Sequence, residues 1–349
     1  MSLRTSFLAL LCAISASLSA QDIVGGVDFT TFFDNREFSP CREQTSLTQF
    51  SARLTPWVGV QWNKSNRLVA GVRLRRDFGR DDDFLTSTDM MFYYRFTSKH
   101  WRAHMGIFDR GVMLGKMNDI IYDPLNAYQD DRIMGAHFAW RGKHSHVEAA
   151  IDWEGQPTEK TREKFRILST AQRAWKHAYI GYDMSMLHLA NDAQPDEVNP
   201  TGVVDHIQML PYAGATFDAF FHFDARATLV ASVQRDRRAK ESHTPLGGMF
   251  SLAMSRWDVT VQHQFYTGKG QQPFAARYGE LLYSGSPLYS ARHYNKTTLS
   301  YAHSFFKRTL NLDVRFIFHH DGYGMGTEQL LTLGVNLEKA WSLKGKTKH

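Results

Sequence analysis

Polar and apolar residues alternate along most of this chain. The segment 221–236 reads FHFDARATLVASVQRD, with apolar side chains such as Phe221, Phe223 and Leu229 on one face and polar ones such as His222 and Asp224 on the other. The same period of two recurs at 68–75, 89–96, 146–153, 257–265 and 310–319. It indicates β-strands with two different faces. Many of these segments run about ten residues, which is longer than the usual strand of a soluble protein.

The gaps between these segments alternate in length. Short turns such as 98–99 and 306–307 alternate with long loops such as 111–130 and 268–292. Long loops at one end and tight turns at the other are typical of a transmembrane antiparallel up-and-down β-barrel. We therefore predict an all-β barrel of about sixteen strands, near 26–36, 48–62, 67–78, 86–97, 100–110, 131–142, 145–155, 163–173, 175–187, 203–215, 219–235, 246–255, 257–267, 293–305, 308–319 and 327–338.

Tryptophans support the membrane interpretation, because they gather beside the short turns. Membrane barrels place aromatic girdles at the two interfaces, where an amphipathic ring lies between acyl chain and water. A soluble β-sandwich core would not restrict tryptophan to one end of its strands. The predicted interfacial girdle consists of Trp62, Trp101, Trp140, Trp175 and Trp257.

The N-terminus predicts export. Arg4 precedes an apolar run at 7–14 and small residues that allow cleavage after Ala20, so residues 1–20 are predicted to be a signal peptide and 21–349 the barrel. Only Cys41 then remains, which excludes a disulfide scaffold. No later run reaches the ~18 apolar residues of a membrane helix. Neither Cys41 nor the basic C-terminal tail receives a role from the sequence.

Charge does not indicate a nucleic-acid partner. The formal net charge is +6, but lysine and arginine are scattered along the chain among aspartate and glutamate. A nucleic-acid-binding protein would gather its positive charge in a patch or stripe. We therefore expect no nucleic acid among its partners.

With this layout the chain resembles the outer-membrane β-barrel porins of Gram-negative bacteria. MGIFDR at 105–110, followed by a long loop, is similar to the Gly-x-Phe strand exit of phosphate-selective-type porins and of Bacteroidota barrels. One departure is the basic tail after the last strand, where porins of the general type end on an aromatic residue. The resemblance implies location in the cell outer membrane, contact with the lipid bilayer and lipopolysaccharide, and passage of small hydrophilic solutes. It leaves open whether the barrel forms a homo-oligomer.

The polar face of the strands would line the lumen, which in a sixteen-stranded barrel is wide enough for water. Two interpretations remain open for its charges. They form a transverse field that filters solutes by charge, or they pair across neighbouring strands and stiffen a filled interior. The predicted lumen-lining charged residues are Arg73, Arg75, Arg95, Arg102, Arg141, Arg226, Arg315, Asp89, Glu148, Asp152, Asp224 and Asp313.

The loop 111–130, GVMLGKMNDIIYDPLNAYQD, is unusually apolar for an exposed loop. Exposing these side chains to water would cost free energy. We predict that the loop folds into the lumen as a constriction, with packing over the barrel mouth as the alternative. The candidate constriction residues are Val112, Leu114, Ile120 and Tyr122.

The sequence offers little evidence for catalysis. HHDGYGMGTE at 319–328 is not expected to bind a metal, because adjacent histidines on a strand point to opposite faces. His263 and His303 are unusual on a lipid-facing wall, but no G-x-S-x-G motif accompanies them. We predict a passive channel that is not an enzyme and needs no cofactor. A closed barrel acting as a surface anchor and an outer-membrane lipid-modifying enzyme are the alternatives.

Overall fold

A computed structural model describes residues 21–80, 84–158, 161–190 and 202–342. The predicted signal peptide at 1–20 and the tail at 343–349 lie outside the described residues. The strands form one antiparallel sheet, and β1 pairs with both β2 and β17, so the sheet closes into a barrel. The short β12 pairs with β11 directly beyond β13, so these two share one position in the wall, and the seventeen strands make sixteen wall positions.

This architecture confirms the predicted sixteen-stranded antiparallel barrel. Strand bounds agree with the predicted ranges to within a few residues at most ends, because the period of two persists until the turn begins. The strands are β1 (Gln21–Glu37), β2 (Leu47–Trp62), β3 (Asn66–Asp77), β4 (Ser87–Thr97), β5 (Trp101–Asp109), β6 (Arg132–Arg141), β7 (Ser145–Gly155), β8 (Glu163–Ala174), β9 (Ala178–Ala190), β10 (Val204–Asp218), β11 (His222–Asp236), β12 (Glu241–His243), β13 (Leu246–Arg256), β14 (Val259–Gly268), β15 (His293–Phe305), β16 (Leu310–His320) and β17 (Met325–Ser342).

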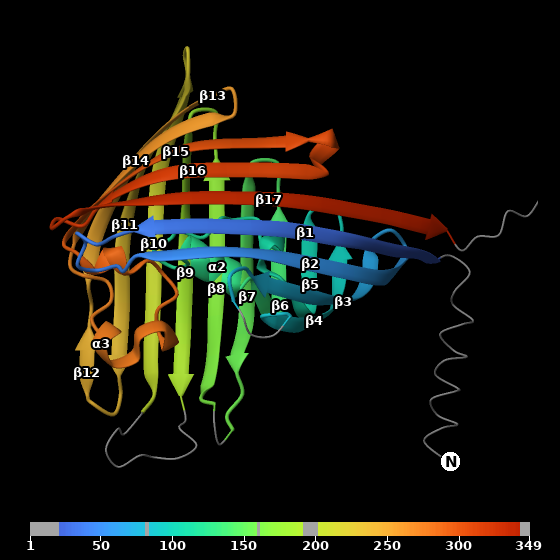
Figure 1. Cartoon of the computed structure of the whole chain (residues 1–349), viewed down its shortest axis with the longest axis horizontal. Coiled ribbons are helices and arrows are strands. Elements are labelled where there is room, and N and C mark those ends of the chain that lie inside the picture. The colour runs from blue at the N-terminus through green and yellow to red at the C-terminus, as the bar shows by residue number, and fades with distance from the viewer. Residues whose placement is uncertain (1–20, 81–83, 159–160, 191–201, 343–349) are drawn as a thin grey trace, which may run out of the picture.

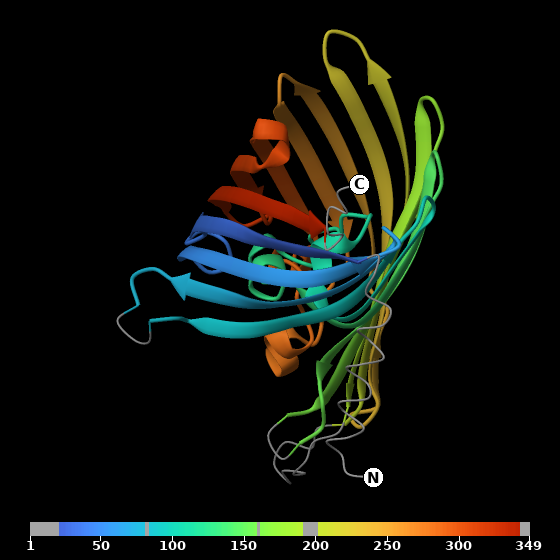
Figure 2. The same cartoon turned by 90° about the vertical axis from the view of Figure 1, so that its right-hand side faces the viewer.

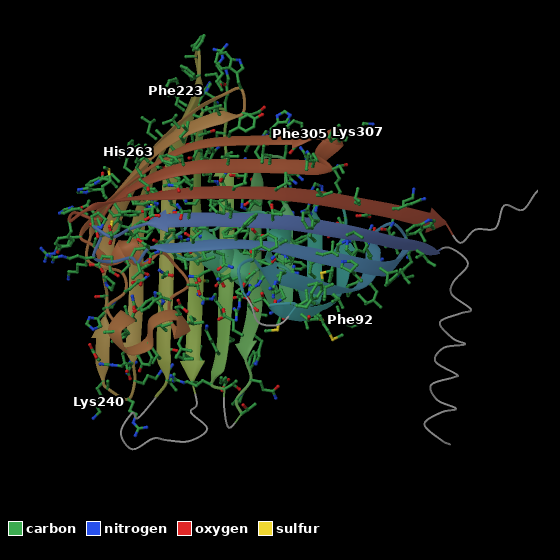
Figure 3. All side chains as sticks on the ribbon, in the orientation of Figure 1. Phe92, Phe223, Lys240, His263, Phe305 and Lys307 are labelled. Carbon is green, nitrogen blue, oxygen red and sulfur yellow. The ribbon has the colours of Figure 1, made fainter. Side chains whose placement is uncertain are left out.

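The strands are strongly tilted. In Figure 1 β17, β1 and β2 run across the view, while β7 to β11 run up and down it, because the front and back walls of a tilted barrel cross. Figure 3 places Lys240 at the long-loop rim, and Phe223, Phe305 and Lys307 at the short-turn rim. β1 begins and β17 ends side by side at the short-turn rim.

Inward and outward residues alternate as the sequence predicts. Along β11 the inward Thr228 and Val230 are buried, whereas the outward Leu229 and Val233 are 49% and 47% exposed. Closure satisfies the backbone of each strand by its neighbours, which a membrane-spanning sheet requires. Among the described residues, no helix has the length and apolar character needed to span a membrane.

The predicted girdle tryptophans lie at or next to the short-turn ends of their strands. Trp101, Trp175 and Trp257 are 42%, 53% and 71% exposed, and Trp62 and Trp140 are half-buried. Trp101 stands opposite Trp140 across β5 and β6, and packs against Phe138. Their role at a membrane interface stays a prediction.

The helices all lie in loops, and the longer ones belong to two long loops. The loop 110–131 contains η2 (Arg110–Val112) and α2 (Pro124–Gln129), and the loop 269–292 contains α3 (Ala275–Tyr278), η3 (Gly279–Leu281) and η4 (Pro287–Ser290); η5 (Phe306–Arg308) is a short turn. Figure 2 shows the segment around α2 between the two walls of the barrel. These two loops position the groups described next.

Candidate functional site

The loop 110–131 crosses the lumen and is attached to opposite walls. The backbone amides of Leu114 and Gly115 donate to Glu148 of β7, at 2.8 and 2.6 Å. The carbonyl of Ile120 accepts from Gln208 of β10 at 3.3 Å. On the far side Asp119 pairs with Lys296 of β15 and Asp123 pairs with Arg36 of β1. Because β1, β7, β10 and β15 are spread around the barrel, the loop bridges its bore.

An apolar cluster fixes this crossing segment. Ile120, Ile121 and Tyr122 are buried against inward side chains of several strands, including Phe108 and Leu168, and against Leu288 and Tyr289 of the second long loop. Burying this much apolar surface away from water stabilises the loop inside the barrel. The remaining loop residues of the predicted constriction, Val112 and Leu114, are half-buried.

A charged network, called here the mouth network, lies where the loop meets β1. It consists of Asp34, Arg36, Asp123, His319 and Glu328, and every one of them is at most 5% exposed. The guanidinium of Arg36 contacts Asp34 at 2.8 Å, Asp123 at 3.1 Å and Glu328 at 3.6 Å. Three carboxylates share one guanidinium, and one oxygen of Asp34 and one of Glu328 have no hydrogen-bond partner in the described part of the chain.

His319 lies behind the guanidinium. Its Nε2 is 3.0 Å from Glu328 Oε2, and its Nδ1 is 2.6 Å from the hydroxyl of Tyr294. A carboxylate only accepts, so Nε2 carries the proton and Nδ1 accepts from the tyrosine hydroxyl. The pair therefore holds Glu328 in place beside Arg36.

The mouth network borders a cleft at the long-loop rim. Its cavity volume is about 270 Å³, and its lining includes Arg36 and Asp123 together with Asn126 of α2, Gln272 and Tyr283. Arg36 is the one cationic side chain in the described lining of the cleft. The charged groups of the described lining are thus one guanidinium, that of Arg36, and two carboxylates, those of Asp123 and Glu280.

Asp123 is the buried carboxylate in the lining of this cleft, whereas Glu280 is exposed. Its Oδ1 accepts from the amides of Leu125 and Asn126 and so caps α2, and it also accepts from Arg36. Burial raises the pKa of Asp123, although Arg36 opposes the shift. A carboxylate with a raised pKa is a stronger base than an ordinary aspartate, which suits it to general acid–base chemistry.

A second network, called here the latch network, lies deeper in the barrel and consists of His104, His137, Glu148 and Thr170. Glu148 accepts from His137 at 2.9 Å and from the hydroxyl of Thr170 at 2.7 Å, besides the two loop amides. His137 Nδ1 is 3.1 Å from His104 Nδ1. Four donors occupy Glu148, so this carboxylate is fully used in holding the loop.

The predicted lumen-lining charges fall into different environments. Arg73, Glu148 and Asp152 are at most 4% exposed, whereas Arg141 is exposed at the short-turn rim. Ion pairs join Arg226 to Asp183 at 3.2 Å and Arg315 to Asp313 at 2.7 Å. The remainder are half-buried, and they are Arg75, Arg95, Arg102, Asp89 and Asp224. A filtering role for these residues stays a prediction.

Sequence reasoning missed the mouth network. Its five members come from three distant parts of the chain, near 34–36, 123 and 319–328. The register of β1, β16 and β17 brings four of them together, and the loop 110–131 brings Asp123 to them. Two of them, His319 and Glu328, lie in the segment that we considered for metal binding. Within the described residues no group of three or more histidine, cysteine, aspartate or glutamate side chains is arranged to hold a metal ion.

Comparison with solved structures supports the barrel fold. Crystal structures of Pseudomonas aeruginosa OpdO and of OccK3 (OpdO) align with TM-scores of 0.53 and 0.54 at 8% identity, covering 92% and 93% of this chain and 98% of theirs. OccK11 (OpdR) of the same organism aligns with a TM-score of 0.52 at 9% identity, covering 91% of this chain and 96% of that one. At such identity the likeness concerns the fold, which is that of an outer-membrane barrel. The predicted passive channel therefore stays a prediction. No curated protein matches the sequence significantly.

A family model covers almost the whole chain. The model described as Lipid A 3′-O-deacylase-type matches residues 16–346. It overturns our prediction that the protein is not an enzyme, because that description names an enzymatic activity. The prediction failed because it relied on a short linear motif, whereas the buried charged groups here are dispersed over the sequence. This chain belongs to the lipid A 3′-O-deacylase-type family.

Proposed function

We propose that this outer-membrane barrel hydrolyses an ester-linked acyl chain of lipid A at the cleft of the long-loop rim. The observation that carries the proposal is the contact of Arg36 with Asp123 in the lining of that cleft, at 3.1 Å. The family description supplies the substrate and the bond. The long-loop rim is the end of an outer-membrane barrel that faces the cell exterior, where a lipid of the outer leaflet has access.

Asp123 serves as the general base. Its Oδ1 is engaged with α2 and Arg36, whereas no described residue is hydrogen-bonded to its Oδ2. A water molecule in the cleft gives its proton to this oxygen and attacks the ester carbonyl. The raised pKa of Asp123 brings the base closer to the working pH and strengthens proton abstraction.

Arg36 stabilises the negative charge that develops on the carbonyl oxygen. A guanidinium fixed by three carboxylates is oriented before the reaction, so it need not reorganise as charge develops. Collapse of the tetrahedral intermediate breaks the acyl–oxygen bond, and the proton held by Asp123 passes to the departing sugar oxygen. His319 and Glu328 are positioning residues, because they act by holding Arg36.

The test is the mass of lipid A after incubation with the purified, folded barrel in detergent micelles. We expect release of one fatty acid, slowed at least ~100-fold in Asp123→Asn, which retains a helix-capping side chain but cannot act as a base. The matched control is Asp131→Asn, because Asp131 follows α2 in the same loop and pairs with Arg53 and Arg73 instead. No fatty acid above the blank, or an equal loss in both variants, would refute the proposal.

A further inference from the structure

A groove is hollowed into the outer, lipid-facing surface of the wall at β10, β11, β13 and β14. Its volume is about 610 Å³, and its lining includes Ala213, Ala227, Gly248, Phe250 and Thr267. It exists because small residues leave space among large ones. A side chain built at Gly248 would meet no atom within 4 Å, whereas Leu229 and Phe250 stand beside it at 49% and 50% exposure.

The strand register gives the groove its direction. Ala213 pairs with Ala227, Ala227 with Phe250, and Phe250 with Phe265, so these outward residues form one row across the strands. The row continues through Asn295 to His320, the last residue of β16 at the long-loop rim. Ala213 lies past the middle of β10 from that rim. The groove therefore descends from the outer rim into the apolar part of the wall.

Polar side chains on the outward face of β14 and β15 lie beside this groove, and of these Thr267 belongs to its lining. Thr267 Oγ1 is 3.0 Å from His293 Nδ1, and His263 Nδ1 is 2.9 Å from Thr297 Oγ1. Figure 3 shows His263 on the outer side of the barrel. Each of these histidines forms its hydrogen bond through Nδ1. Its Nε2 has no hydrogen-bond partner among the residues that the structure describes. Polar groups facing hydrocarbon cost free energy unless a polar partner satisfies them.

We propose that this wall is a binding site for one molecule of a lipid A-type glycolipid, with an acyl chain in the groove and the sugar head on four polar residues of two neighbouring rows near the long-loop rim. These residues are Thr267 and its partner His293, and Asn295 and its partner His320. Histidine, threonine and asparagine provide both donors and acceptors, which suits sugar hydroxyls. The bilayer already surrounds acyl chains with hydrocarbon, so the groove contributes packing, and the four polar residues contribute the selection. The site lies outside the barrel, and its existence does not depend on the proposed hydrolysis.

Native mass spectrometry of the detergent-solubilised barrel titrated with lipid A tests this site. We expect one retained lipid A molecule per barrel, with affinity reduced about tenfold in Gly248→Phe, which corresponds to ~1.4 kcal/mol. Thr267→Val, which keeps the size of the side chain, should weaken binding severalfold. The matched control is Ala70→Phe, a small-to-large change at an exposed residue of β3, and it should bind as the wild type does.

Equal retention in wild type and Gly248→Phe would overturn the proposal, as would equal binding of phosphatidylethanolamine, which would indicate a site for any lipid. Because the retained lipid is weighed, loss of an acyl chain is recorded separately from binding. A barrel that binds intact lipid A but never cleaves it would refute the proposed function alone. Gel mobility before and after heating shows whether each variant is folded.

Discussion

Two histidine–glutamate pairs lie inside this barrel with nearly equal burial, yet their carboxylates are used differently. Glu148, 2% exposed, accepts from His137, from Thr170 and from two loop amides. Glu328, 4% exposed, accepts from His319 through one oxygen. The other oxygen has no hydrogen bond among the described residues and lies 3.6 Å from the guanidinium of Arg36. Burial and residue type are the same, so the surroundings alone separate the two pairs.

This difference distinguishes a carboxylate that fixes a loop from a carboxylate that belongs to a functional site. A carboxylate with four donors is fully satisfied, and its contribution is to fix the loop 110–131 in the lumen. Glu328 has one oxygen without a hydrogen bond, and it contacts Arg36, which lines the cleft. Keeping this buried oxygen unsatisfied costs free energy, and such a cost is typical of functional sites. We therefore assign stability to the latch network and function to the mouth network.

The largest expected difference between the latch network and the mouth network is in their contributions to the free energy of unfolding. Glu148→Gln places an amide NH₂ against donors that need an acceptor, so we expect the free energy of unfolding to fall by about 3 kcal/mol. Glu328→Gln should cost about 1 kcal/mol, because Asp34 and Asp123 still neutralise Arg36. Urea-induced unfolding in detergent, followed by gel mobility, measures both values. A larger loss for Glu328→Gln would reverse the assignment.

Conductance measurements test whether the latch network holds the loop 110–131 across the lumen. Since the loop bridges the bore, we expect the wild-type barrel to show small conductance or none in a planar bilayer, and Glu148→Gln to raise it severalfold by freeing Leu114 and Gly115. Glu328→Gln serves as the control and should conduct as the wild type does. Large, regular steps from the wild type would contradict a bridged lumen and favour the predicted passive channel.

A smaller effect concerns pH. Burial raises the pKa of Asp123, so this carboxyl keeps its proton to a higher pH than an ordinary aspartate. The base is active only when ionised, so fatty-acid release should fall as pH decreases through a midpoint above that of a solvent-exposed aspartate. A rate–pH profile of the wild type measures the midpoint. An acidic limb at the ordinary aspartate value, or none, would count against Asp123 as the base.

The barrel could be predicted from sequence because its signal is local. Alternation such as that of 221–236 is complete within one strand, and the alternation of short and long gaps then fixes the antiparallel order. The predicted start of β9, at 175, differs by three residues from the observed start at Ala178, because Trp175 is an apolar residue that lies in the turn. Apolar residues at a turn carry no information about where pairing stops.

The site could not be predicted in the same way. Arg36 and Asp123 are 87 residues apart, and they meet only because the loop enters the lumen and returns to β1. The apolar character of 111–130 did signal an unusual loop, but not which charged groups it would bury. His319 and Glu328 were visible together, yet their facing positions follow from the register of β16 and β17.

The rate of fatty-acid release from lipid A by Glu328→Gln and by Glu148→Gln, each divided by its folded fraction, tests the division between the two networks most directly. We expect Glu328→Gln to be at least ~10-fold slower than the wild type in kcat, because Arg36 loses one of its supports. Glu148→Gln should remain within about threefold, because Asp123, although it lies in the same loop, keeps its own contacts with Arg36 and with the α2 amides. Equal losses in the two variants, or a greater loss in Glu148→Gln, would contradict the account.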